Sequence, residues 1–233
     1  MKIKTVTITG ADNNTTINEM AQITNDFPFV EWGILFSPKR VGTERYPDFK
    51  WLSELHDHWL EEKINLSAHL CGQYTREMLA GKCTLISNAP FVDHLEIFKR
   101  FQLNFSALKN DVDIDAFFEL LDKLKLNFIL QKNYSNFGIC QTAMHYKNIS
   151  FLYDSSGGRG LAPICWEKPV TGFFNGYSGG LSPDNLESSL KKIEQVVGDH
   201  EIWIDVESNV RTYGKLDMDK VKKFLSIARE YTI

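Results

Sequence analysis

Strand-like and helix-like segments alternate along almost the whole chain, and this order restricts the fold more than any other feature. The strand-like runs are rich in apolar and β-branched residues, and the segments after them show helical periodicity. The strand-like runs are Thr5–Thr9, Val30–Phe36, Ile64–Cys71, Phe101–Phe105, Asn127–Gln131, Ile149–Tyr153, Thr171–Tyr177 and Glu201–Val206. Helices are expected at Ile17–Asp26, Phe49–Lys63, Tyr74–Ala80, Ile114–Lys125, Asp184–Val197 and Asp217–Tyr231.

A repeated strand-then-helix order predicts a parallel sheet, because each helix returns the chain to the end where the next strand begins. Eight such units in 233 residues predict an α/β protein with a closed (β/α)8 barrel. No linker or composition break is visible, so we expect a single domain over residues 1–233. An open, doubly wound sheet is the alternative. Leu79–Arg100 is the least regular stretch, and a turn is expected at Ser87–Pro90.

Composition limits the partners that such a chain would have. A net charge of −4 argues against nucleic acid and against an anionic membrane surface. No apolar run approaches the roughly 18 residues of a membrane span, and the first ten residues alternate like a strand rather than like a signal peptide. Cys71, Cys83, Cys140 and Cys165 show no CxxC spacing, so we expect free thiols in a cytoplasmic protein.

One loop has the composition of an anion site. An apolar run ends in Ser178-Gly179-Gly180, and Ser182 and Pro183 stand where the N-cap and first residue of a helix belong. Such a helix would point its free N–H groups at the loop, and glycine lets an anion approach the backbone closely. A strand-to-helix turn without a ligand is the alternative. Because the loop follows the seventh of eight strands, we favour a phosphate site.

Residues at the carboxyl ends of the strands are the first candidates for chemistry in a barrel of this kind. Asp154 precedes a glycine-rich loop, Ser155–Gly160, that could cover a ligand, as suits a general acid or base. It could instead cap its own turn. His69 and Cys71 share one face of a strand and could serve as base and nucleophile, although such residues more often pack in a core. Lys132 is the candidate Schiff-base former.

Other strand ends carry further polar residues. Lys39, Arg40 and Arg45 form a basic loop that could meet a carboxylate or phosphate. The remaining candidates at strand ends are Thr9, Asp12, Asn104, Gln131, Asp205 and Glu207. His56 and His58 lie two apart on an expected helix and therefore face different ways, which makes them poor metal ligands. No HExxH, Walker or GxGxxG motif is present, so we expect no metal and no cofactor.

Three stretches in the second half resemble a known family, in order and at suitable spacing. They are Leu152–Gly160 with Trp166 downstream, Ser178–Asn185, and Ile204–Val210 followed by Gly214–Val221. They resemble the Leu-Asp-Thr stretch with its glycine loop, the phosphate-binding loop and helix, and the last strand and final helix of phosphoribosylanthranilate isomerase, an enzyme of tryptophan biosynthesis. The first half is similar more loosely, at Thr7–Gly10, Gly33–Lys39 and Phe101–Asn104.

The resemblance implies an Amadori-type isomerisation of a phosphorylated sugar without a cofactor. Asp154 would be the general acid that opens the sugar ring, and a base would remove the C2 proton. Phosphate would be held by residues after the seventh and eighth strands, with Arg40 as a further candidate for the substrate's anionic groups. These phosphate-binding candidates are Ser178, Gly179, Gly180, Ser208 and Asn209.

Two departures from the family pattern leave the chemistry open. Thr9 stands where the family has its cysteine base, and Asn209 replaces a glycine beside the phosphate site. Candidate replacement bases are His69, Cys71, Asp12 and Glu207. We therefore expect an isomerase with an altered base, acting as a monomer or homodimer. A phosphosugar lyase or aldolase, or a non-catalytic phosphosugar-binding protein, are the alternatives.

Overall fold

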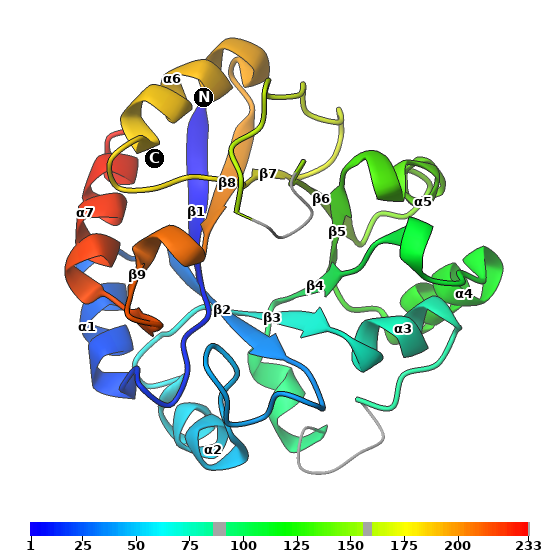
Figure 1. Ribbon diagram of the computed structural model, residues 1–233, viewed down its shortest axis with the longest axis horizontal. Helices are drawn as coiled ribbons and strands as arrows, with labels where there is room; N and C mark the ends of the chain where they lie inside the picture. The colour runs from blue at the N-terminus through cyan, green and yellow to red at the C-terminus, as the bar shows by residue number, and fades with distance from the viewer. Residues whose placement is uncertain (86–91, 156–159, 233) are drawn as a thin grey trace.

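The computed structural model describes residues 1–85, 92–155 and 160–232, and its centre is a closed barrel of eight parallel strands (Figure 1). The strands are β1 Lys2–Thr9, β2 Val30–Phe36, β3 Leu66–Cys71, β4 Arg100–Asn104, β5 Phe128–Lys132, β6 Ile149–Tyr153, β7 Asn175–Tyr177 and β8 Glu201–Val206. They pair in chain order, and β8 closes the ring against β1. The predicted (β/α)8 barrel is confirmed, and the open sheet is excluded.

Helices surround the barrel (Figure 1). They are α1 Ile17–Asp26, α2 Phe49–His58, α3 Gln73–Leu79, α4 Ile114–Leu124, α5 Phe137–Ala143, α6 Leu186–Val197 and α7 Met218–Arg229. Short 3-10 helices are η1 Val92–Ile97, η2 Ala107–Lys109, η3 Tyr134–Asn136 and η4 Ser208–Val210, and a small hairpin pairs β9 Arg211–Thr212 with β10 Lys215–Leu216. None of the helices described is long and apolar enough to cross a bilayer.

Several predicted boundaries were wrong by a few residues. β7 has three residues instead of seven, because Gly172 takes a positive φ of 85° and the Asn175 side chain binds the backbone of Val170 in a turn. The helix predicted over Phe49–Lys63 ends at His58. The short helix α5 and the β9–β10 hairpin were not predicted. The turn expected at Ser87–Pro90 lies outside the described residues.

Alternation along the strands divides the side chains between two layers. In β8, Ile202, Ile204 and Val206 pack outward in the large core between strands and helices. Trp203 points inward, where it packs with Ile129, Leu152 and Phe174. Successive side chains of β8 therefore point to opposite sides of the barrel wall, as the two-residue period of a strand requires.

An ion pair fills the amino-terminal part of the barrel interior. Arg100 donates to the Glu31 carboxylate at 2.6 Å, and the Thr7 hydroxyl donates to the same carboxylate at 3.0 Å. The guanidinium lies 4.4 Å from the centre of the Trp203 ring. Burial raises the pKa of Glu31, but the charge and hydrogen bonds of Arg100 outweigh it and hold the pKa below its ordinary value. These side chains fill the barrel interior below the carboxyl ends of the strands.

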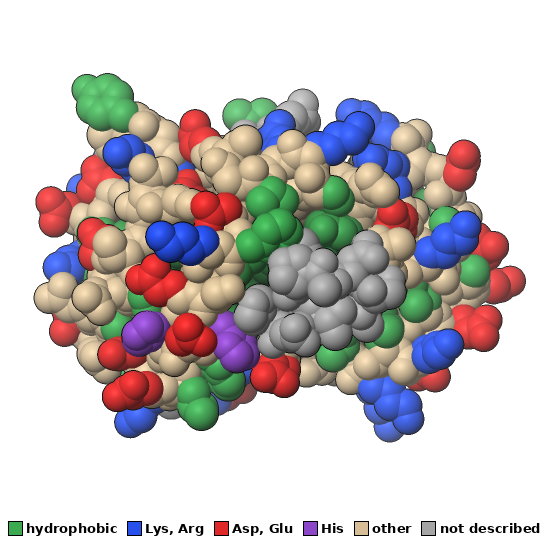
Figure 2. All heavy atoms as spheres, turned by 90° about the horizontal axis from the view of Figure 1, so that it is seen from below, with side chains coloured by type: hydrophobic (Ala, Val, Ile, Leu, Met, Phe, Trp, Pro, Cys, Tyr) green, Lys and Arg blue, Asp and Glu red, His purple; other side chains and the backbone are tan. Residues whose placement is uncertain are grey.

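The face shown in Figure 2 carries interspersed acidic and basic side chains, without a continuous basic stripe.

Candidate functional site

A cavity of about 960 Å³ opens at the carboxyl ends of the strands. Its floor consists of polar side chains that point into the barrel, and its walls are the loops that follow β2, β4, β5, β6, β7 and β8. This volume lies near the upper end of the range for small-molecule sites, roughly 300–1,000 Å³. Floor residues of the cavity are His69, Gln102, Gln131, Asp154 and Asp205.

Two buried carboxyl groups lie in this floor. Asp154 follows β6, is 4% exposed, and accepts a hydrogen bond from Gln131 Nε2 at 3.2 Å. Its Oδ1 is 3.7 Å from the point where a Cβ of Gly179 would lie, so the carboxyl borders the loop after β7. Asp205 on β8 is 7% exposed and accepts from the Thr9 hydroxyl at 2.8 Å.

The environment of Asp205 favours its protonated form. Burial is the largest influence, and it raises the pKa of Asp205 to about 8 although the Thr9 hydrogen bond opposes it. The carboxylates of Glu207, Glu31 and Asp154 raise it further. At neutral pH this carboxyl therefore holds its proton for most of the time.

Gly33 on β2 makes room for two side chains inside the barrel. A Cβ at this position would lie 2.5 Å from Thr9 Oγ1 and 2.9 Å from His69 Nε2. His69 is 1% exposed, and its Nε2 is 3.2 Å from the Ser67 hydroxyl. Burial lowers the pKa of His69 to about 4, helped by the charge of Arg100, so its ring is neutral and only weakly basic at pH 7.

Cys71 lies nearer the cavity mouth than His69 on the same strand. Burial raises the pKa of its thiol, while a hydrogen bond from Asn104 Nδ2, at 3.2 Å from the sulfur, opposes this. The thiol therefore stays protonated near neutral pH and is a poor base.

The loop after β7 has the geometry of a backbone anion site. Gly179 and Gly180 have positive φ angles of 98° and 68°, and their N–H groups donate to no acceptor in the part of the chain that the structure describes. The segment at Leu161 and Ala162 covers the loop closely: a Cβ on Gly179 would lie 2.8 Å from the Leu161 carbonyl oxygen, and one on Gly180 would lie 2.7 Å from the Ala162 Cα. Glycine is therefore required at both positions.

The loop after β8 lies beside this one. The Asn209 side chain donates to the Leu181 carbonyl at 2.9 Å and thereby ties the two loops together. Arg45 donates to the Ser208 hydroxyl at 3.2 Å and to the Glu207 carboxylate at 2.6 Å, so one cation borders the loop pair. Loops after strands 7 and 8 are a common place for phosphate in such barrels.

The helix expected to have Ser182 as its N-cap begins later, so the N-cap prediction was wrong. α6 begins at Leu186 with Asn185 as its N-cap. Ser182 and Asn185 hydrogen-bond each other's backbone N–H groups through their side chains, and Asn185 Nδ2 also donates to the Gly180 carbonyl at 2.8 Å. These bonds close a turn before the helix, and Pro183 belongs to that turn. Ser178, Gly179, Gly180 and Leu181 of this loop border the cavity.

A comparison with protein-family models finds a match to the family described as N-(5'phosphoribosyl)anthranilate (PRA) isomerase, over residues 88–227. This is more than half of the 233 residues. The chain belongs to the PRA isomerase family.

Solved structures give the same fold. A monomeric form of the dimeric PRA isomerase of Thermotoga maritima has a TM-score of 0.59 at 18% identity, with 98% of this chain and 99% of that chain covered. PRA isomerase of Pyrococcus furiosus has a TM-score of 0.56 at 13% identity, with 97% and 98% covered. A truncated 3-deoxy-D-arabino-heptulosonate 7-phosphate synthase of T. maritima has a TM-score of 0.57 at 12% identity, with 98% and 86% covered.

In this member of the PRA isomerase family, most of the predicted site residues border one cavity. They are Arg40, His69, Cys71, Asp154, Ser178, Gly179, Gly180, Ser208 and Asn209. Thr9 lies just beneath the floor, bound to Asp205. Residues 156–159 of the predicted covering loop lie outside the described residues.

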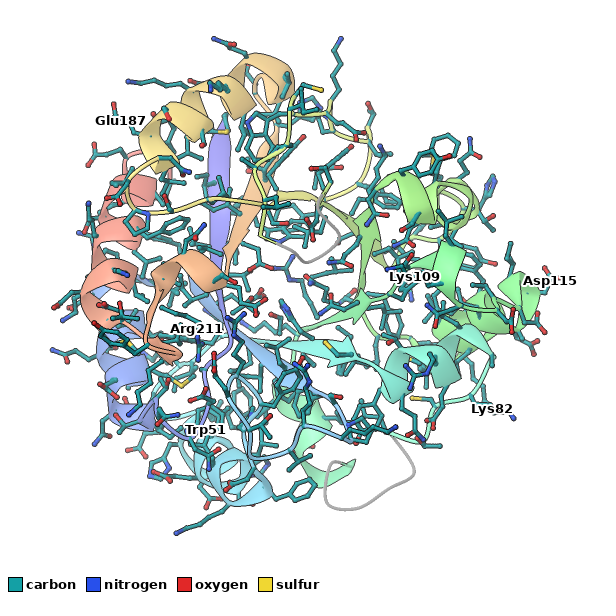
Figure 3. The ribbon with its side chains drawn as sticks, viewed as in Figure 1. Trp51, Lys82, Lys109, Asp115, Glu187 and Arg211 are labelled. Carbon is teal, nitrogen blue, oxygen red and sulfur yellow. The ribbon has the colours of Figure 1, made fainter. Side chains whose placement is uncertain are left out.

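Two other candidates point elsewhere. Lys132, proposed above as a Schiff-base former, turns away from the cavity: its ammonium is 2.5 Å from the Glu167 carboxylate and 4.8 Å from the centre of the Tyr153 ring. Asp12 accepts from the backbone N–H of Arg45 and from the Arg211 guanidinium, which also donates to the Gly10 carbonyl. Arg211 is labelled in Figure 3. It holds loops together and does not line the cavity.

Sequence reasoning undervalued Asp205, which it named only as a strand end. Thr9 and Asp205 are 196 residues apart and meet because β1 and β8 pair where the barrel closes. The available signal was the inward alternation of β8, which places Asp205 on the same face as Trp203. Among residues 1–85, 92–155 and 160–232, no three His, Cys, Asp or Glu side chains are grouped to hold a metal ion.

Proposed function

We propose that this protein binds a phosphorylated sugar in the cavity at the carboxyl ends of the strands and isomerises it by acid–base catalysis. The observation that carries the proposal is the meeting of two features in one cavity. The backbone N–H groups of Gly179 and Gly180, which have no acceptor among the described residues, lie beside the buried carboxyl of Asp154. Membership of the PRA isomerase family makes PRA the first substrate to test.

The phosphate would bind to the loops after β7 and β8. Unpaired N–H donors suit phosphate oxygens, and glycine at both loop positions keeps side chains out of the way. Arg45 adds a cation at the edge, bound to Ser208. Glu207 offsets part of that charge, so the backbone donors supply most of the attraction.

Amide side chains on β4 and β5 would hold the sugar. Gln102, Asn104 and Gln131 line the floor, and amide side chains can pair with the hydroxyl groups of a sugar. Gln102 Nε2 donates to Asn104 Oδ1 at 2.8 Å and so helps to orient the Asn104 amide, while Gln102 Oε1 is enclosed and has no partner among the described residues.

Asp154 is the general acid of this proposal. It lies between the phosphate loop and the amide-lined floor, so a sugar with its phosphate on Gly179 and Gly180 would bring its ring oxygen toward this carboxyl. Protonation of that oxygen breaks the C1–O bond and leaves an iminium group when the substrate is an aminosugar such as PRA. The outward direction of Lys132 argues against a lyase or aldolase that uses that lysine.

Phosphosugar binding can be tested by thermal unfolding. Ribose 5-phosphate or inorganic phosphate at about 100 times its Kd should stabilise the protein by about 2.7 kcal/mol, which is a Tm rise of roughly 5–10 °C for a protein of this size. Ribose should act more weakly. Gly180→Ala should reduce the shift, because the new methyl group collides with Ala162. Gly138→Ala on the exposed side of α5, where a Cβ meets nothing within 4 Å, is the matched control and should keep it.

The reaction products distinguish the three possible functions. An isomerase converts PRA into a compound of identical mass, a lyase yields two smaller fragments, and a non-catalytic binder returns the compound unchanged. Chromatography with mass detection therefore separates the three. Unchanged PRA together with a normal phosphate-dependent Tm shift would overturn the catalytic half of the proposal.

A further inference from the structure

We propose that Asp205, held by the Thr9 hydroxyl, is the base that takes the substrate's C2 proton in this protein. The inference rests on the proposed isomerase function and identifies the general base that this function requires. Family enzymes are expected to use a cysteine where this chain has Thr9, and a threonine hydroxyl is too weak an acid to supply an alkoxide near neutral pH.

The other candidates are unsuited to the role. The Glu207 carboxylate is paired with Arg45 at 2.6 Å, and Asp12 is 3.1 Å from the buried guanidinium of Arg211. Cys71 stays a thiol, and His69 is a weakly basic neutral ring in the depth of the barrel. Of the other carboxyl groups that line the cavity, Glu44 is 3.4 Å from the Arg45 guanidinium and Asp154 is assigned to the acid step. Asp205 remains, and its side-chain partner among the described residues is the uncharged Thr9 hydroxyl.

The geometry gives Asp205 one anchored oxygen and one open oxygen. Oδ1 accepts from the Thr9 hydroxyl at 2.8 Å. Oδ2 accepts from no group among the described residues, and it is absent from their fully enclosed unpaired atoms, so the cavity reaches it. Thr9 is thus a positioning residue: it fixes the rotation of the carboxyl and leaves the second oxygen facing the ligand. Gly33 supplies the space in which Thr9 adopts this position.

Charged groups elsewhere in the barrel increase the proton affinity of this carboxyl. Glu31 on β2, Asp154 after β6 and Glu207 after β8 all oppose its ionisation. Arg100 neutralises part of the Glu31 charge, Arg45 part of the Glu207 charge, and His69 on β3 carries no charge.

The proton affinity that results suits a base working near neutral pH. With a pKa near 8, about a tenth of Asp205 is ionised at pH 7, and that fraction is far more basic than an ordinary carboxylate.

The proton transfer needs no co-reactant. After Asp154 has protonated the ring oxygen and the C1–O bond has broken, the substrate carries a C1=N iminium group. Asp205 removes the proton from C2; the electrons of the C2–H bond form a C1=C2 double bond, and the π electrons of C1=N return to nitrogen. The C2 hydroxyl then gives its proton to the Asp154 carboxylate and becomes a carbonyl, while Asp205 returns its proton to C1. Both carboxyl groups thereby regain their starting protonation states and the isomerisation is complete.

The test is the pH dependence of kcat for PRA in the wild type, Asp205→Asn and Thr9→Val. In the wild type, kcat should rise with pH as a group with a pKa near 8 ionises. Asp205→Asn should lower kcat by about 100-fold or more, while the Tm shift with ribose 5-phosphate persists. Thr9→Val removes a hydrogen bond that favours the carboxylate form of Asp205. The rise of kcat with pH (the rising limb) should therefore move to higher pH, and kcat should approach the wild-type value there. A purely structural role for Thr9 would not move this limb.

The outcomes separate this inference from the proposed function. Wild-type turnover that survives in Asp205→Asn within a few-fold, or a limb that Thr9→Val leaves in place, overturns the role of Asp205 and leaves the isomerase function standing. A wild type that neither binds ribose 5-phosphate nor consumes PRA overturns both. The asparagine variant should fold, because asparagine resembles the protonated carboxyl that the barrel already holds.

Discussion

Replacing Asp205 with asparagine should stabilise this protein at neutral and alkaline pH and should not do so in acid. The folded protein keeps a proton on Asp205 up to about pH 8, whereas the unfolded chain releases it near the ordinary aspartate pKa of 3.8. Between these values the folded state binds more protons than the unfolded state, so the free energy of unfolding falls as pH rises. The asparagine variant has no proton to lose at this position.

The size of the effect follows from the same difference. The Asp205 contribution changes by about 1.4 kcal/mol per pH unit between pH 4 and pH 8, which amounts to about 4 kcal/mol between pH 4 and pH 7. Near pH 4 the variant should be equal to the wild type or slightly less stable, since one amide hydrogen can lack a partner. The two stability curves should therefore cross between pH 4 and pH 7.

Urea unfolding at pH 4, 5, 6, 7 and 8, with equal m-values in both proteins, measures the two curves. Asp122→Asn on the exposed side of α4 is the matched control, because it removes one surface carboxylate, and its curve should run parallel to the wild type. An Asp205→Asn curve that also runs parallel to the wild type would refute the raised proton affinity.

Three further results are expected. Glu31→Gln should destabilise the protein by about 3–5 kcal/mol, because it leaves the buried guanidinium of Arg100 without its carboxylate; urea unfolding measures this, and a cost below 1 kcal/mol would contradict it. Lys132→Met should keep PRA turnover within a few-fold in a steady-state assay, since Lys132 faces Glu167 rather than the cavity, and a large loss would restore the Schiff-base reading. Gly33→Ala should cost about 1–3 kcal/mol and impair turnover by displacing Thr9; an active variant with unchanged Tm would count against that packing.

The barrel could be predicted because its signals are local and repeated. Eight apolar runs at regular spacing leave few arrangements for a chain of this length, and the alternation in β8 already separated inward from outward residues. The boundaries failed where side chains compete with regular structure. Asn185 closes a turn with Ser182 and delays α6, and Asn175 shortens β7 by binding Val170.

The position of the site could be predicted from the sequence, but the contacts between its residues could not. Strand ends and glycine loops indicated which residues would border the cavity. Closure of the barrel decided which of them meet, and the hydrogen bond between Thr9 and Asp205 depends on that closure. Burial then decided which could act as a base: it leaves His69 weakly basic and Cys71 protonated, while it makes Asp205 a stronger base.

The most direct test of the account is the initial rate of PRA consumption by the purified protein, compared with buffer alone and with the Asp154→Asn variant. The account predicts a saturable rate well above buffer for the wild type and a rate at least about 100-fold lower for the variant. A wild-type rate equal to that of buffer, or a variant as fast as the wild type, would contradict it.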